Sequence, residues 1–229
     1  MPTVNDVLHC LELFAPYELA ESWDNCGLMT GDRTRKVERI LCALDATEDV
    51  VAHHPLIFTS VHCVTEDDAT GRALRQAIRH DIAVICMHTN ADCAKSGVND
   101  ALAVALGLSN VINMEAGENK MLGRVGDLPA RMSPKIFAEY VKDSLDAGGV
   151  RFTDGGACGK MMDCALAKGA DAFVIGDCSY DIMQRAQSLG LTLVDAGHFP
   201  TENPIAKTFA EHLGRCFPTV TTMVSEDHR

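Results

Sequence analysis

The sequence lacks the long apolar runs of a membrane protein and the positive charge of a nucleic-acid-binding protein. No run approaches the roughly 18 consecutive apolar residues of a membrane span, and the first residues have no cationic segment typical of a signal peptide. The 20 Lys and Arg residues face 32 Asp and Glu residues, so the formal net charge is −12. Such an acidic surface repels phosphate backbones and anionic lipid head groups. We therefore expect neither a nucleic acid nor a membrane as partner.

The ten cysteines include no C-x-x-C pair, and several lie in apolar runs such as residues 82–87. This is typical of a reducing compartment, where cysteine packs as a small hydrophobic residue. The expected location is therefore the cytoplasm. Four histidines fall on predicted helices or on the C-terminal tail, where we expect them to be solvated: His9, His80, His212 and His228.

Apolar periodicity predicts strands that alternate with helices, which favours an α/β fold with mostly parallel sheets and helices on their faces. Predicted helices cover residues 5–13, 73–80, 98–106, 134–145, 160–168, 180–189 and about 204–213, and predicted strands cover 37–45, 49–52, 82–87, 150–153, 171–175 and 191–194. The polar, glycine-rich stretch 117–126 suggests a boundary. We expect a first α/β unit of residues 1–120 with 199–229, and a second of residues 121–198, packed closely together.

One predicted connection is too short. If residues 37–45 and 49–52 were neighbouring parallel strands, the few residues between them could not make the crossover, which needs about a dozen residues. Either the second strand is misplaced or a helix-sized segment is missing at this point.

Polar side chains collect where the predicted strands end. In an open parallel sheet the ligands bind beyond the carboxyl ends of the strands. The doublet His53 and His54 follows one strand, Asp92 follows another, and His198 with Glu202 follows the last. Histidine with carboxylate suits Zn, Fe, Mn, Co or Ni better than Ca or Mg. A lone histidine at a strand end is more often a hydrogen-bonded structural residue, so the signal is the combination.

Other polar residues near these strand ends could support such a site. Asp24, Asn25 and His88 are candidates for holding the metal ligands in place by hydrogen bonds, and Trp23 is expected as an anchor in the core or at the rim. If the substrate carried a triphosphate, the chain would offer few cations for it: Lys95, Arg124 and Lys160.

Several segments together resemble one known family. They are ESWDNCGLMTGD at 21–32, LDAT at 44–47, AHHPLIF at 52–58, MHTNAD and GVNDALA within 87–103, and DAGHFPTE at 195–202. In this order they are similar to the dinuclear-metal, hexameric family named for an NGG-interacting factor, whose bacterial members are called GTP cyclohydrolase I type II homologues. The chain departs from the family where it is short: at 46–52, before the histidine doublet, and at 150–156, before a glycine turn.

The resemblance implies a two-lobed fold of α/β/α layers with the metal site between the lobes, and a homohexamer. It implies two divalent transition metal ions held by His53, His54, Asp92, His198 and Glu202, the residues that the strand ends also suggest. The implied activity is a hydrolase in which a metal-bound hydroxide attacks the purine ring of the nucleotide GTP and formate is released. The alternatives are a metal-binding or regulatory scaffold without catalysis, and a two-metal phosphoesterase.

Overall fold

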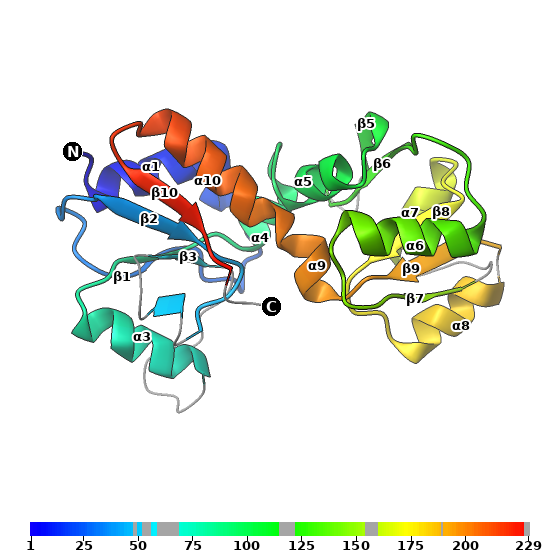
Figure 1. Ribbon diagram of the computed structural model, residues 1–229, viewed down its shortest axis with the longest axis horizontal. Coiled ribbons are helices and arrows are strands. Elements are labelled where there is room, and N and C mark those ends of the chain that lie inside the picture. The colour runs from blue at the N-terminus through cyan, green and yellow to red at the C-terminus, as the bar shows by residue number, and fades with distance from the viewer. Residues whose placement is uncertain are drawn as a thin grey trace. The chain divides into compact units, whose positions relative to one another are not determined.

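The structure is a computed structural model that describes residues 1–47, 50–51, 56–58, 69–114, 122–153, 160–188 and 190–226. The chain divides into two compact units (Figure 1). Unit 1 consists of residues 1–97 with 205–229, and unit 2 consists of residues 98–204. Among the described residues, no helix is long and apolar enough to cross a membrane.

Unit 1 opens with helix α1, Val4–Phe14, which confirms the first predicted helix. Thr3 caps the helix by accepting a hydrogen bond from the backbone N–H of Asp6, whose carboxylate in turn accepts one from the backbone of Thr3. The buried residues Val4, Val7, Leu8 and Leu11 follow the helical period and form one apolar face.

The sheet of unit 1 has five strands in the order β1-β4-β3-β2-β10. The strands are β1 (Gly27–Thr30), β2 (Arg39–Cys42), β3 (Leu56–Phe58), β4 (Val84–Cys86) and β10 (Thr221–Val224). All neighbouring pairs are parallel except β1 with β4. The mostly parallel sheet that the sequence predicts is therefore present, although β1 and β10 were not expected.

The strand predicted over 49–52 is wrong. Val50 and Val51 are helical and fully buried, and the strand that pairs with β2 starts at Leu56. Residues 43–55 thus connect β2 to β3, which is long enough for a parallel crossover. The short segment at 46–52 is compatible with the sheet, and no missing helix has to be assumed.

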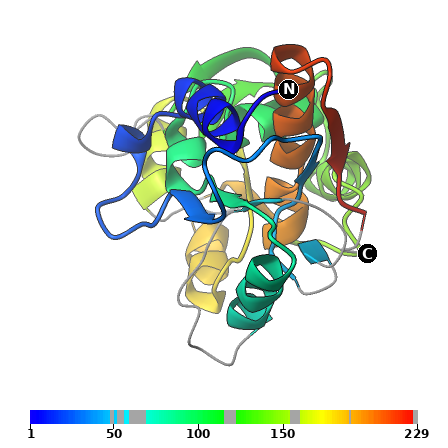
Figure 2. The ribbon, with the colours of Figure 1, turned by 90° about the vertical axis from the view of Figure 1, so that its left-hand side faces the viewer.

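Helices cover both faces of this sheet (Figures 1 and 2). Helix α3, Ala69–Arg79, packs Ala73, Leu74 and Ala77 into a buried cluster with Leu41 and Val84 of the sheet. Helices α1 and α10, Pro204–Cys216, lie together on the opposite face. Unit 1 also contains the short helical segments η1 (Tyr17–Leu19) and α4 (Thr89–Cys93).

Unit 2 is built on a three-stranded sheet of order β7-β9-β8, with β8 and β9 parallel. On β9, Leu193 packs in a cluster with Ala186 of α8, whereas the next residue, Val194, packs in a cluster with Phe137 and Val141 of α6. Because side chains alternate across a strand, helices cover both faces and give α/β/α layers. The elements are β7 (Arg151–Phe152), β8 (Ala172–Ile175), β9 (Thr192–Asp195), α5 (Val98–Ala105), α6 (Pro134–Ser144), α7 (Lys160–Ala167), α8 (Tyr180–Ser188) and α9 (His198–Glu202).

The boundaries of the units differ from those expected. The divisions fall after Gly97 and after Pro204 instead of at 120 and 198. The stretch 117–126 lies within unit 2, and its last residues belong to β6 (Arg124–Asp127), which pairs antiparallel with β5 (Ser109–Asn113). The boundary suggested there is therefore not a boundary between the two units.

Candidate metal centre

In unit 1, the candidate site residues follow strand β4. His88 precedes the short helix α4, which carries Thr89, Asn90 and Asp92. Asn90 is fully buried and fixes this helix: its side chain donates to the Ala15 carbonyl (2.8 Å) and accepts from the backbone N–H of His88 (2.9 Å). The predicted ligand Asp92 is half-buried in the same turn.

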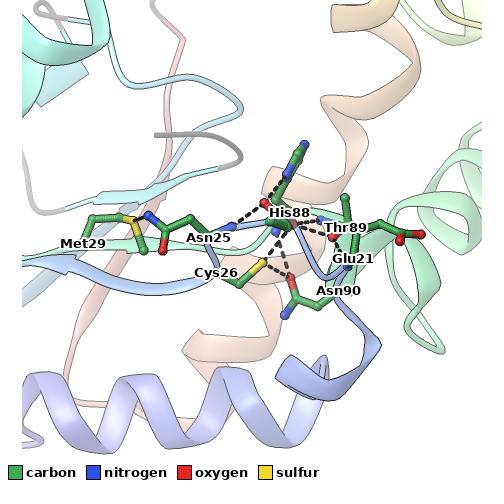
Figure 3. A network of polar contacts seen from close by, with 8 residues as sticks. Glu21, Asn25, Cys26, Met29, His88, Thr89 and Asn90 are labelled. Carbon is green, nitrogen blue, oxygen red and sulfur yellow. Dashed lines mark hydrogen bonds and ion pairs between the residues drawn. The ribbon is translucent and has the colours of Figure 1, made fainter. Parts of the chain in front are cut away.

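A polar network around Asp24 connects the segment before β1 to α4, and Figure 3 shows its labelled members Cys26, His88 and Thr89. The Asp24 carboxylate lies 2.8 Å from Nδ1 of His88 and accepts from the backbone N–H (3.0 Å) and the hydroxyl of Thr89. The thiol of Cys26 donates to the same carboxylate (3.2 Å). Asp24 and His88 are therefore brought together, as expected for residues that support a site.

Hydrogen bonding keeps this carboxylate charged. Burial by itself would raise the pKa of Asp24, but the hydrogen bonds from Thr89, His88 and Cys26 outweigh it and lower the pKa far below the usual range. With Nδ1 of His88 facing a charged carboxylate, that nitrogen carries the proton, and Nε2 is left as the outward-facing ring nitrogen.

The residues that flank Asp24 in the sequence, Trp23 and Asn25, match the sequence predictions only in part. Trp23 is 71% exposed, so it is a rim residue and not part of the core, and its ring meets the ring of His88 edge-on at 6.1 Å between centroids. Asn25 contacts Asp24 through its backbone N–H (2.8 Å), whereas its side chain reaches Met29.

In unit 2, the candidate residues follow the parallel strands β8 and β9. His198 and Glu202 occupy the first and last positions of α9, and Nε2 of His198 lies 3.1 Å from Oε2 of Glu202. The helical geometry required for this i, i+4 pair is present. Nδ1 of His198 lies 3.1 Å from Oδ2 of Asp177, which follows β8.

Two backbone features hold this arrangement. Asp177 has a positive φ of 62°, a left-handed conformation that Asp tolerates better than most residues. Gly176 lies so close to α9 that a Cβ there would come within 2.6 Å of Oγ1 of Thr201 and 2.9 Å of Cα of His198. The end of β8 can thus meet the start of α9 only with glycine at this position.

Asp195, at the end of β9, is a buried anchor for the same loops. Its carboxylate forms an ion pair with Arg151 and accepts from the backbone N–H groups of Cys178 (3.2 Å) and Gly197 (3.1 Å). Burial would raise the pKa of Asp195, but the bonds from Gly197, Arg151 and Cys178 lower it. One buried carboxylate therefore fixes the loops that follow both strands.

The donor set of unit 2 fits a transition metal. Two ligands at about 2.1 Å from one ion are separated by about 3.0 Å in octahedral and about 3.4 Å in tetrahedral geometry, and the His198 and Glu202 atoms are 3.1 Å apart. A histidine that binds metal usually has its other ring nitrogen held by a carboxylate, and Asp177 does this for His198. Asp177 is not among the candidate residues named from the sequence, and the structure places it beside His198.

The remaining predicted ligands, His53 and His54, lie outside the described residues. The helical Val50 and Val51 replace the strand that was expected to present them. The five-residue ligand set as a whole therefore stays a prediction, with Asp92 placed in unit 1 and His198 and Glu202 placed in unit 2.

Comparison with known proteins places the chain in a family. The family model Duf34/NIF3 (NGG1p interacting factor 3) matches residues 2–229. The chain belongs to the NIF3 family. The NIF3 relatives include a GTP cyclohydrolase 1 type 2 homolog of Clostridium perfringens, which is 32% identical over 88% of this chain and 87% of that protein. A Helicobacter pylori protein named GTP cyclohydrolase 1 type 2 is 31% identical over 93% of this chain and 92% of its own length.

Solved structures agree with the NIF3 fold. A Bacillus cereus protein related to NIF3 superposes with a TM-score of 0.86 at 24% identity, covering 99% of this chain and 97% of that one. A Staphylococcus aureus hypothetical protein gives the same TM-score and coverage at 27% identity. The α/β architecture predicted from the sequence is thereby confirmed.

Proposed function

We propose that this NIF3 protein is a metal-dependent hydrolase with a dinuclear centre. His53, His54, Asp92, His198 and Glu202 would hold two divalent transition metal ions of the Zn, Fe, Mn, Co or Ni class. The main support is the arrangement in unit 2, where Asp177 holds Nδ1 of His198 and leaves Nε2 beside the Glu202 carboxylate.

When bound, two such ions lower the pKa of a water molecule towards neutrality and polarise the electrophile. The chain would supply the proton transfer. Nε2 of His88 can accept or donate a proton because Asp24 holds the proton on Nδ1. Glu202 would serve as a ligand, so His88 is the better candidate for this task.

The proposed substrate is GTP, whose purine ring would be opened with release of formate. Support comes from the names of the relatives in Clostridium perfringens and Helicobacter pylori. Arg124, suggested by the sequence as a cation for the triphosphate, is paired with Asp100 through two bonds of 2.7 Å and is buried. Phosphate binding would therefore depend on Lys95, which is exposed, on Lys160 and on the bound ions.

The exposed ring of Trp23 offers a second contact for such a substrate. It lies edge-on to His88, and a purine could stack on its free face. Replacing Trp23 with Leu should then raise KM for GTP and leave the metal content unchanged.

The first test is metal analysis, followed by incubation of the metal-loaded protein with GTP and measurement of formate. We expect close to two equivalents of transition metal per chain to be lost, and turnover to disappear, when Asp92→Ala and His198→Ala are combined. The control is Cys164→Ser, on α7. Metal content below about one equivalent would contradict the dinuclear centre. If the protein binds its full complement of metal but releases no formate from GTP, the result favours a metal-binding scaffold without catalysis. If it instead releases phosphate from a phosphomonoester, the result favours a phosphoesterase.

The assembly is a separate proposal. We propose a homohexamer on the basis of family resemblance, and light scattering coupled to gel filtration should return six times the chain mass of 24.7 kDa. A monomeric mass would contradict it.

A further inference from the structure

A sulfur-containing cluster lies in unit 1, apart from the candidate ligands. Cys10 of α1 and His212 and Cys216 of α10 have ligand atoms that all lie within 4.8 Å of one another. Nε2 of His212 is 3.4 Å from Sγ of Cys10 and 3.6 Å from Sγ of Cys216. A single ring nitrogen therefore faces two thiols.

The packing of the two helices creates this cluster. The Phe14 ring of α1 contacts Phe209 and His212 of α10, with centroid separations of 5.3 and 4.7 Å. These contacts bring α1 against α10, although Cys10 and His212 are 202 residues apart in the sequence. His212 and Cys216 are four residues apart on one helix and so share a face.

His212 is therefore not the solvated histidine that the sequence suggested. Its ring is half-buried between Phe14 and the two thiols, and burial lowers its pKa. Cys216 is exposed and Cys10 is half-buried, so an ion could reach the cluster from solvent. His9 and His80, by contrast, are exposed as expected.

We propose that Cys10, His212 and Cys216 form a second metal site that binds a thiophilic ion of the Zn²⁺ class. Zinc takes sulfur ligands at about 2.3 Å and nitrogen ligands at about 2.0 to 2.1 Å, which sets the S···N edge of a tetrahedron at about 3.6 Å. The two S···N distances of 3.4 and 3.6 Å match this edge. Three protein ligands leave the fourth position of the tetrahedron for water.

The chemistry of this site differs from that of the proposed dinuclear centre. Two thiolates and one imidazole favour a soft ion, whereas the histidine and carboxylate set of the other site contains no sulfur. On binding, each thiol would release its proton to solvent, and the two thiolates would offset the charge of the ion. The bound ion would link the first helix of the chain to the last.

Titration with Co²⁺ under reducing conditions can separate the two sites, because only thiolate ligands give a sulfur-to-cobalt charge-transfer band in the near ultraviolet. We expect this band in the wild type and in the double variant Asp92→Ala with His198→Ala, which lacks ligands of the other centre. We expect its loss in Cys216→Ser, whose exposed position makes misfolding improbable, and in His212→Gln. Cys164→Ser is the matched control and should keep the band.

Three results would overturn the proposal. They are no charge-transfer band in the wild type, an unchanged band in Cys216→Ser, and loss of the band in the double variant of the other centre. Thermal unfolding gives an independent readout: Zn²⁺ should raise the Tm of the double variant, and this shift should vanish when Cys216→Ser is added.

Discussion

Asp177 and His198 meet at the carboxyl ends of two adjacent parallel strands, with Oδ2 and Nδ1 separated by 3.1 Å. Neither residue is enclosed: the side chains are 75% and 60% exposed. An exposed pair of this kind contributes little to stability. The pair instead orients the imidazole of His198, so that Nε2 is turned towards Glu202.

Asp177→Asn should therefore weaken metal binding without unfolding the protein. Asparagine tolerates the same left-handed backbone but holds Nδ1–H less strongly, so we expect a loss of about 10- to 100-fold in affinity for the ion that His198 would bind. Calorimetric titration with Zn²⁺ measures this. Asp171→Asn, at an exposed carboxylate just before β8, is the control. Equal affinities for both variants would show that Asp177 does not orient His198.

Gly176→Ala should disturb the same region through the backbone. The added methyl group would come within 2.6 Å of Oγ1 of Thr201 and 2.9 Å of a backbone atom of His198. We expect a loss of about 1 to 3 kcal/mol in the free energy of unfolding, together with reduced metal uptake. Urea denaturation followed by circular dichroism measures the stability. Gly148→Ala, where an added Cβ meets no atom within 4 Å, should change neither quantity.

Asp195→Asn should destabilise unit 2 more strongly. The substitution leaves Arg151 without its charged partner and weakens the bonds that hold Cys178 and Gly197. Because the Asp195 side chain is only 4% exposed, we expect a loss of about 3 kcal/mol. The measurement is the urea midpoint, with exposed Asp181→Asn as the control. A midpoint like that of the control would contradict the role of Asp195 as an anchor.

The Asp24 network predicts a specific dependence of stability on pH. The folded pKa of Asp24 lies below its unfolded value of about 3.9. Its stabilising contribution is therefore complete above that unfolded value and is lost as the pH falls below it. In urea titrations, the difference between wild type and Asp24→Asn should be constant from about pH 5 to 7 and shrink below about pH 4. Exposed Glu38→Gln serves as the comparison. A difference that does not change with pH would show that the charge of Asp24 is unimportant.

The sequence predicts best those elements whose signals are local. Helix α1 follows from a capping residue and a regular apolar face, and the pair His198 and Glu202 follows from helical spacing. Val50 and Val51 mislead because two β-branched residues favour a strand in isolation, whereas in the fold both are helical and fully buried. Strand β5 is exposed along its whole length, so it has no alternating pattern to detect.

Contacts between distant segments have no such local signal. The cluster of Cys10 with His212 depends on the packing of the first helix against the last. In the same way, Asp24 reaches Thr89 across a separation of 65 residues. Asp177 could have been found because it ends a strand next to the one that leads to His198, if the strand order had been known.

The parallel pairing of β10 with β2 has a consequence for biosynthesis. Unit 2 is one continuous segment, whereas unit 1 needs residues 205–229, which leave the ribosome after all of unit 2. We therefore expect unit 2 to fold during translation. At that stage the sheet of unit 1 still lacks β10, so one side of β2 is unpaired. Until β10 has been synthesised, that strand is an open edge on which a nascent chain can aggregate or recruit a chaperone.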